Sequence, residues 1–296
     1  LAVVLLVRIL LPTRAAFLNP YTLTLDVSIK RLATFFHAGI PLSLRGICCI
    51  LLGLTLAGRA AILATTNMNQ MPIAGPFLLA TFNAQGFIDW FLIECLDFAF
   101  FYFSILSATT FFRLWHLLKP IPGFVADTFF IAAYPFTRLK LHIQFLVLIL
   151  GGMLLFAAVQ ALNPNIESLF QITTTFQEDF PPLEAQYIQN LFNLQSLPIG
   201  LWHLTLSLLT MLNVLIQIAD ILLMFGFLFL IALLMRAKYI HLFIHEALQL
   251  ICGRFKMFRI GVINLTPILL FLLFPFIYFI IAVFVICLAK SFVYVV

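Results

Sequence analysis

The sequence predicts an all-α protein: a polytopic transmembrane helical bundle made of three repeats of span, interfacial amphipathic helix and span. The first observation is the composition, since hydrophobic residues make up 64% of the 296-residue chain and charged residues only 9%. A soluble domain carries roughly a quarter charged residues. The second observation is a series of long apolar windows, and the third is the position of the basic residues between them.

The apolar windows are long enough to cross a bilayer, which takes about 20 helical residues. They predict full spans at 46–64, 91–112, 143–162, 213–235 and 261–288, after a shorter apolar stretch at 1–11. Because residues 1–12 are too few for a span, we expect the first helix to begin upstream of Leu1.

The basic residues predict how these spans are oriented. Thirteen of the sixteen Lys and Arg residues fall in the segments 14–45, 113–140 and 236–259, and the loops 65–90 and 163–211 contain none. Lys and Arg beside apolar spans collect on the inner, cytoplasmic face of a membrane. Six spans with both chain ends outside satisfy this rule. The formal charge of +5 therefore reports topology and excludes a nucleic-acid groove.

Each basic segment is expected to hold an amphipathic helix in the plane of the interface. In the third segment the apolar residues recur at helical spacing: Ile240, Phe243, Ile244, Ala247, Leu248 and Ile251. In the second segment Phe124, Val125, Phe129 and Ala132 follow a Pro-Ile-Pro-Gly breaker. The first segment also alternates as a strand would, but an unpaired strand edge at membrane depth leaves backbone groups unsatisfied, so a helix is favoured.

These elements divide the chain into three hairpin units and two outer loops. The first unit covers 1–66, with its N-terminal span truncated, and an outer loop covers 67–90. The second unit covers 91–162. An acidic outer loop with short helices follows at 163–211, and the third unit covers 212–296. A repeated unit of this kind indicates duplication.

Two parts of the chain carry recognisable motifs: "LLVRIL" and "NPY" near the N-terminus, and "HEALQLICGRFKMFRIGVINLTPILLFLL" from His245 to Leu273. With these motifs the first and third units resemble the YggT family of membrane proteins (YlmG-like). The family has Asp and Ser where this chain has Asn264 and Thr266, before Pro267, which conserves helix-capping chemistry. The middle unit matches only in layout, and family members usually have one or two units. The resemblance implies no enzymatic activity and a role in membrane-protein or cytochrome assembly, osmotic tolerance or envelope organisation.

Arg59, Asp97 and Asp220 each lie inside a predicted span. Counted from the inner ends of their spans, all three are roughly 21–24 Å deep at about 1.5 Å per residue. A lone charge at that depth costs several kcal/mol, so pairing is expected. We therefore predict an ion pair between Arg59 and Asp97 or Asp220, against the alternatives of snorkelling to the outer interface and of an ion or proton pathway.

The histidines suggest two weaker sites. His241 and His245 are four residues apart on one helix face, a spacing that suits a metal, although no third ligand is near and a polar stripe at headgroup level is favoured. His116, His142 and His203 raise haem ligation. His116 and His142 lie at the inner boundary and His203 near the outer one, so they cannot all serve one haem. No metal and no cofactor is expected.

Two further surfaces are predicted. A ridge of small residues, Cys49, Gly53, Ala57 and Ala61, together with Gly151 and Gly152 on another span, predicts close helix packing. Basic side chains are expected to face lipid or a partner from the inner interface: Lys30, Arg31, Arg138, Lys140, Arg254, Lys256 and Arg259.

The sequence favours a non-enzymatic accessory, assembly or scaffold protein of a larger membrane complex. No phosphate-binding loop, nucleophile elbow or acid–base carboxylate pair is present. Membrane lipids and other integral subunits are the expected partners, without nucleic acid. The expected location is the bacterial inner membrane, with a thylakoid or other organelle membrane as the alternative. The alternative functions are a channel or transporter in osmotic or ion homeostasis, and a haem-binding subunit of an electron-transfer complex.

Overall fold

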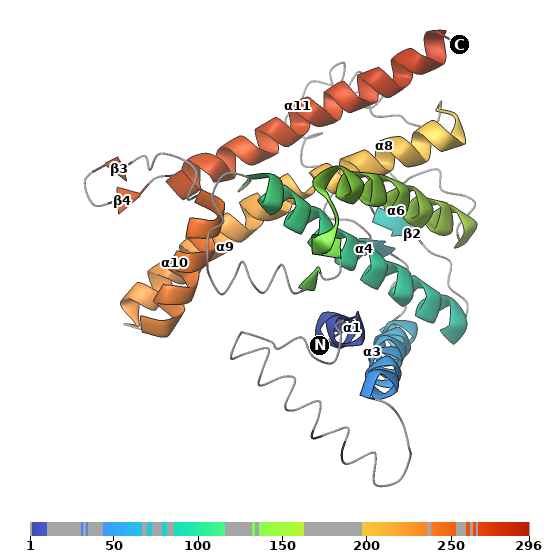
Figure 1. Cartoon of the computed structure of the whole chain (residues 1–296), viewed down its shortest axis with the longest axis horizontal. Helices are drawn as coiled ribbons and strands as arrows, with labels where there is room; N and C mark the ends of the chain where they lie inside the picture. The colour runs from blue at the N-terminus through green and yellow to red at the C-terminus, as the bar shows by residue number, and fades with distance from the viewer. Residues whose placement is uncertain are drawn as a thin grey trace.

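The fold is seen in a computed structural model of the chain (Figure 1). The structure describes residues 2–10, 31, 34, 44–66, 70–72, 79–81, 86–115, 132–133, 136–162, 197–235, 238–252, 259–260, 263–264 and 266–295.

Helices dominate the described residues. They are α1 (Ala2–Leu10), α3 (Leu44–Thr66), α4 (Phe87–Trp115), the single 3-10 turn η1 (Phe136–Arg138), α6 (Leu141–Leu162), α8 (Ile199–Leu212), α9 (Val214–Leu234), α10 (Lys238–Cys252) and α11 (Thr266–Val295). Two short antiparallel ladders lie outside them. One joins β1 (Gln70–Pro72) to β2 (Leu79–Thr81), with Met71 opposite Ala80, and the other joins β3 (Arg259–Ile260) to β4 (Ile263–Asn264).

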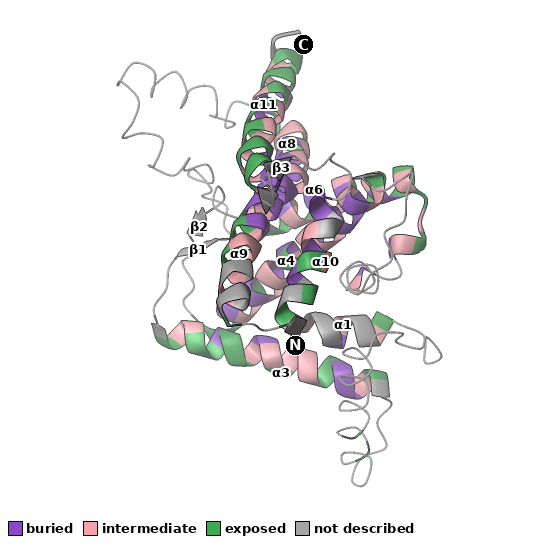
Figure 2. Ribbon diagram, turned by 90° about the vertical axis from the view of Figure 1, so that its left-hand side faces the viewer, coloured by how far each residue is buried: buried purple, intermediate pink, exposed green. Residues whose placement is uncertain are grey.

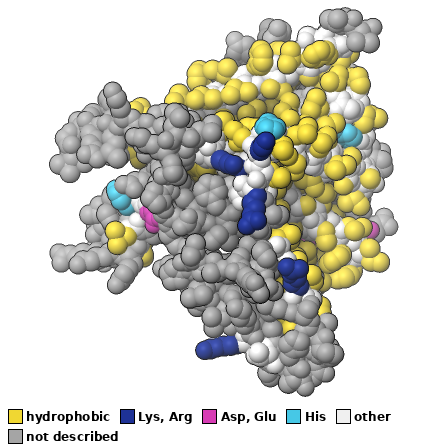
Figure 3. Space-filling model, viewed as in Figure 1, with side chains coloured by type: hydrophobic (Ala, Val, Ile, Leu, Met, Phe, Trp, Pro, Cys, Tyr) yellow, Lys and Arg dark blue, Asp and Glu magenta, His cyan; other side chains and the backbone are white. Residues whose placement is uncertain are grey.

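Five helical stretches among the described residues are long and apolar enough to cross a membrane: 45–65, 87–114, 141–162, 199–228 and 266–293. Their outward faces remain apolar, as Leu54 and Leu154 show with exposed fractions of 63% and 72%. Apolar side chains cover most of the described surface on the face drawn in Figure 3. Water would oppose that exposure and lipid would not. The all-α polytopic architecture predicted from the sequence is confirmed, and the protein is an integral membrane protein.

One predicted boundary is wrong. The sequence placed residues 199–211 in the outer loop and began a span at Asn213, but residues 199–212 form α8. Backbone hydrogen bonds from Asn213 N to Leu209 O and from Gln217 N to Asn213 O carry the helix on into α9. The polar residues of this stretch made it resemble a loop. In the structure Thr205 and Thr210 donate their hydroxyl hydrogens to backbone carbonyls of their own helix, so a helix in lipid tolerates them.

The second basic segment is described only near its end. Ala132 is helical, as expected for the last residue of the predicted helix, and beyond it Ala133 and Phe136 are buried with Phe103 of α4 and Leu148 of α6. The hydroxyl of Tyr102 donates to the carbonyl of Ala132 at 3.3 Å. The segment therefore turns back between two spans. Backbone that is not helical is tolerated at such depth only where protein groups satisfy it. The other residues of this predicted helix, 124, 125 and 129, lie outside the described residues.

The third basic segment forms the predicted helix, α10, which follows α9 closely. Its residues Ile244, Ala247 and Ile251 are buried, and Ala247 and Ile251 share a cluster with residues of α9 and α11. Most of the first basic segment lies outside the described residues. The three-fold repeat therefore stays a prediction, for which only the third unit shows span, helix and span in order.

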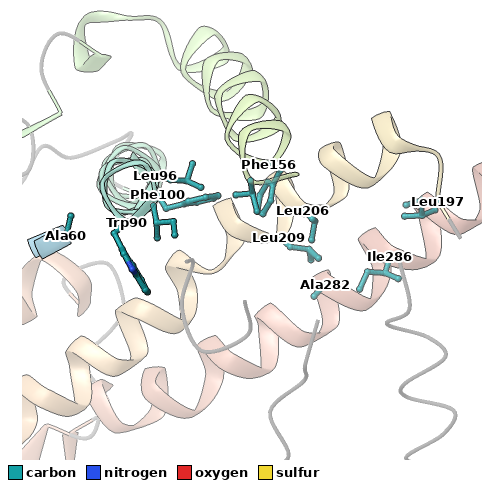
Figure 4. Close-up of a cluster of buried hydrophobic side chains, with 13 residues drawn as sticks. Ala60, Trp90, Leu96, Phe100, Phe156, Leu197, Leu206, Leu209, Ala282 and Ile286 are labelled. Carbon is teal, nitrogen blue, oxygen red and sulfur yellow. The ribbon is translucent and has the colours of Figure 1, made fainter. Parts of the chain in front are cut away.

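The core lies where α4, α6, α8 and α11 meet (Figure 4). The rings of Phe100 and Phe156 stack edge to face with centroids 5.2 Å apart, and Phe156 contacts Trp202 in the same way. Ala282 and Ile286 of α11 complete the cluster. Away from it, α1 and α3 lie side by side at one edge of the bundle (Figure 2), joined by contacts around Leu5 and Cys48. The outer half of α3 reaches the core through Ala60.

Candidate functional site

A charged cluster joins α3 to α4 inside the spans. Arg59 of α3 lies between Glu94 and Asp97 of α4: its Nε is 3.1 Å from Oε2 of Glu94, and its Nη2 donates to Oδ2 of Asp97 at 3.4 Å. The structure thus brings together Arg59 and Asp97, one of the two pairs that the sequence predicted. Glu94 was missed, although its signal was available, because residues three apart lie on the same face of a helix.

The three side chains differ in exposure. The exposed fraction is 0% for Glu94, 21% for Asp97 and 53% for Arg59. Among the described residues, neither carboxylate oxygen of Glu94 accepts a hydrogen bond, so its contact with Arg59 is an ion pair without hydrogen-bond geometry. An ionised carboxylate buried in an apolar medium is stabilised only by a nearby opposite charge. Arg59 supplies that charge, and its other side opens to the exterior of the bundle.

The cluster lies toward the outer ends of its spans. Arg59 is seven residues before the end of α3, and Glu94 seven residues after the start of α4. At 1.5 Å per residue, both Cα atoms are about 10 Å from the outer ends of their helices. An arginine at this depth stays within reach of the headgroup layer, but the two carboxylates are short and remain among apolar groups.

Asp220 does not join this cluster. The side-chain amide of Gln217 donates to Oγ of Ser104 at 3.4 Å, which fixes the level of α9 against α4. Asp97 is seven residues from Ser104 toward the outer side, and Asp220 is three residues from Gln217 toward the inner side. The two carboxylates are therefore about 15 Å apart along the helix axes. Asp220 is exposed, and within the part of the chain that the structure describes it has no ion-pair partner. The helix begins earlier than predicted, at Ile199, so the count from Arg236 placed Asp220 too far outward.

Four polar side chains lie further inward on α4, α6 and α9, and we refer to them together as the inner polar junction: Ser104, Ser107, Gln144 and Gln217. Phe103 packs near Leu148, and one turn further inward on each antiparallel helix lie Ser107 and Gln144, on the same faces. Both are buried. Gln144 donates from Nε2 to the carbonyl of Phe136 at 2.9 Å, while its Oε1 and the Ser107 hydroxyl have no hydrogen-bond partner in the part of the chain that the structure describes.

Arg113, in the last turn of α4, binds the residues that precede α6. Its Nη1 donates to the carbonyls of Thr137 and Leu139 at 2.8 and 2.7 Å. A charged donor bonded to two carbonyls compensates for their removal from water. Arg113 therefore has a local structural role: it anchors Thr137 and Leu139, just before α6, to the end of α4.

The histidines that the structure describes do not assemble a cofactor site. His203 is buried and shares a hydrogen bond of 2.9 Å with Oε1 of Gln160, near the outer end of α6. His142 is exposed at the inner end of the same helix. Eighteen residues separate Gln160 from His142, about 27 Å, so these two histidines cannot ligate one haem. His116 and the side chain of His241 lie outside the described residues, and His245 is exposed on α10. Among the residues described, no three His, Cys, Asp or Glu side chains come together as a metal site.

The predicted ridge of small residues does not pack against the helices that the structure describes. Cys49 and Ala61 are exposed, Ala57 is half-buried, and a Cβ atom added at Gly53 would meet open space. The contacts of α3 use the neighbouring face, with Cys48, Leu56 and Ala60 buried. Gly152 does pack closely, as predicted. A Cβ atom there would overlap the Ser207 side chain, 2.9 Å from its Cβ. At Gly151 it would meet nothing.

The predicted basic surface is described only in part. Arg31, Arg138 and Lys140 are exposed, whereas the side chains of Lys30, Arg254, Lys256 and Arg259 lie outside the description. Cys252, at the end of α10, is buried, and burial raises the pKa of its thiol to about 12. Such a thiol is protonated at physiological pH and is a poor nucleophile.

The chain matches no protein-family model, no curated protein and no solved structure.

Proposed function

We propose that the chain is a non-enzymatic accessory or assembly subunit of a larger membrane complex. The charged cluster carries this proposal. Charged side chains are costly within a membrane and normally face the interior of a bundle or a partner. Arg59 and Asp97 instead reach the exterior of this bundle from within two spans, with exposed fractions of 53% and 21%. Contact with another integral subunit would remove them from lipid.

The resemblance to the YggT family supports the same role, because that family is associated with membrane-protein assembly. We propose membership of that family with an additional hairpin unit, and placement in the bacterial inner membrane. Lipids would contact the exposed basic residues Arg31, Arg138 and Lys140 at the inner face.

The proposal is tested by purifying the tagged chain from its native membrane in mild detergent and identifying stoichiometric integral subunits. We expect such subunits to co-purify with the wild type and to be lost from the Asp97→Asn variant. The matched control is Asp220→Asn, since Asp220 is exposed on a span but lies away from the cluster. A particle without partners would contradict the proposal.

Transport is the second candidate, favoured by the inner polar junction. Unpartnered hydroxyl and amide oxygens of Ser107 and Gln144 in a span suit water or a small polar solute. Against it, the apolar layer around Phe100 and Phe156 lies between this junction and the charged cluster. A flux assay in liposomes distinguishes the two functions. If the chain is an accessory subunit, we expect no solute flux above that of empty vesicles. A flux that Ser107→Leu abolishes would favour transport.

A further inference from the structure

We propose that the open side of the charged cluster binds a transmembrane helix of another protein through one basic side chain. The basic group, a lysine or arginine, would lie in the outer third of the bilayer beside Asp97. This inference rests on the proposed accessory role and names the chemistry of the partner.

The charge of the cluster selects a basic occupant. With both carboxylates ionised, Glu94 and Asp97 carry two negative charges against the one positive charge of Arg59, all within 3.4 Å contacts. A second copy of this chain would bring the same excess and leave it uncompensated. A lipid phosphate could bind Arg59 but would add to the negative charge. A lysine or arginine neutralises the excess, and at this depth that neutralisation is worth more than in water.

The surroundings of the cluster select a helix in the membrane. One turn from Arg59 on α3 lies Ile62, and one turn from Asp97 on α4 lies Phe101, with exposed fractions of 63% and 56%. A partner that covers Asp97 must therefore also cover large apolar side chains. An apolar helix with a single basic residue matches both features, because it packs against the apolar residues and places its charge at the carboxylates.

The depth of the cluster fixes where the partner's basic residue must be. The cluster is about 10 Å from the outer ends of α3 and α4. A lysine near the inner end of the partner helix would lie some 15–20 Å away and could not reach it. The position of the lysine along the partner helix therefore distinguishes binding at this cluster from general electrostatic attraction, which would not depend on that position.

The test uses purified full-length chain in liposomes and synthetic Leu/Ala transmembrane peptides, with binding followed by energy transfer between fluorophores. One peptide carries Lys about 10 Å from its outer end, the second Gln at the same position, and the third Lys near its inner end. We expect the first peptide to bind at least about tenfold more tightly than the other two. The Asp97→Asn variant should lose this preference, and the Asp220→Asn variant should keep it.

Neutralising Arg59 distinguishes the proposed electrostatic role of the charged cluster from a purely structural role. Arg59→Gln removes the competing cation, so binding of the outer-Lys peptide should become tighter, provided that the melting temperature shows a folded variant. If the variants fail to fold, the comparison of peptides on the wild type decides alone. Equal binding of the Lys and Gln peptides to the wild type would overturn the proposal.

Other occupants give different results. Energy transfer between copies of the chain that Asp97→Asn abolishes would overturn the proposal in favour of a second copy. Retention of anionic lipid that Arg59→Gln abolishes would overturn it in favour of a lipid. If native subunits co-purify but the peptides bind equally, the accessory role stands and its docking surface is elsewhere. Selective peptide binding without any native partner would support the site and contradict the subunit role.

Discussion

Replacing Gly152 with alanine tests the close contact between α6 and α8. The added Cβ would lie 2.9 Å from Cβ of Ser207 and 3.2 Å from Cζ of Phe103. Since both α6 and α8 are fixed by the surrounding core, the helices must separate, and overpacking of this kind costs about 1–3 kcal/mol. Separation would also stretch the hydrogen bond from the Ser207 hydroxyl to the carbonyl of Ile149, now 2.9 Å, which is worth about 1 kcal/mol.

The assay is reversible unfolding of the purified protein in mixed micelles with increasing SDS. Gly152→Ala should lower the free energy of unfolding by about 1–3 kcal/mol. The matched control is Gly151→Ala, one residue away with open space around its Cβ. Its effect should stay within about 0.5 kcal/mol. Adding Ser207→Gly should recover part of the loss from Gly152→Ala. Equal free energies of unfolding for the two glycine variants would show that the helices are not in close contact at Gly152.

Two further predictions concern the inner side of the bundle. Arg113→Leu removes the charged donor to the carbonyls of Thr137 and Leu139 and should lower the free energy of unfolding in the same assay by about 1.5–3 kcal/mol; an unchanged stability would show that these carbonyls find other donors. Cys252 should resist maleimide from pH 7 to pH 9.5 in the folded protein, because with a pKa of about 12 less than about 1% of the thiol is ionised there. Its labelling should become rapid after denaturation in SDS, and rapid labelling of the native protein at pH 8, located by mass spectrometry, would contradict its burial.

The spans were predictable because hydropathy and charge act over many residues at once. The predicted span 143–162 and the observed α6, Leu141–Leu162, share their last residue and differ by two at the start. The entry of residues 132–133 and 136–139 between two spans was not predictable in this way. It depends on single side chains, Tyr102, Arg113 and Gln144, whose hydrogen bonds to the segment's carbonyls appear only once α4 and α6 are packed.

The candidate site was predictable in part for the same reason. An arginine in a span requires a carboxylate, which identifies Asp97, but depth counted along the chain depends on where each helix starts. The start of α8 at Ile199 moves Asp220 inward and removes it from the cluster. The ridge through Gly53 illustrates another limit. Small residues at helical spacing permit close packing, but which face of α3 meets α4 is decided by the whole interface, including Leu56 and Ala60.

The coupling between Arg59 and Glu94 tests the charged cluster most directly. Arg59→Gln, Glu94→Gln and the double variant form a cycle whose interaction free energy can be measured by SDS unfolding in mixed micelles. We predict a favourable coupling of about 0.5–3 kcal/mol, because Arg59→Gln alone leaves two carboxylates without their cation, whereas the same change made together with Glu94→Gln leaves only Asp97. Single effects that add to within about 0.3 kcal/mol would show that the two side chains do not interact, and would contradict the charged cluster.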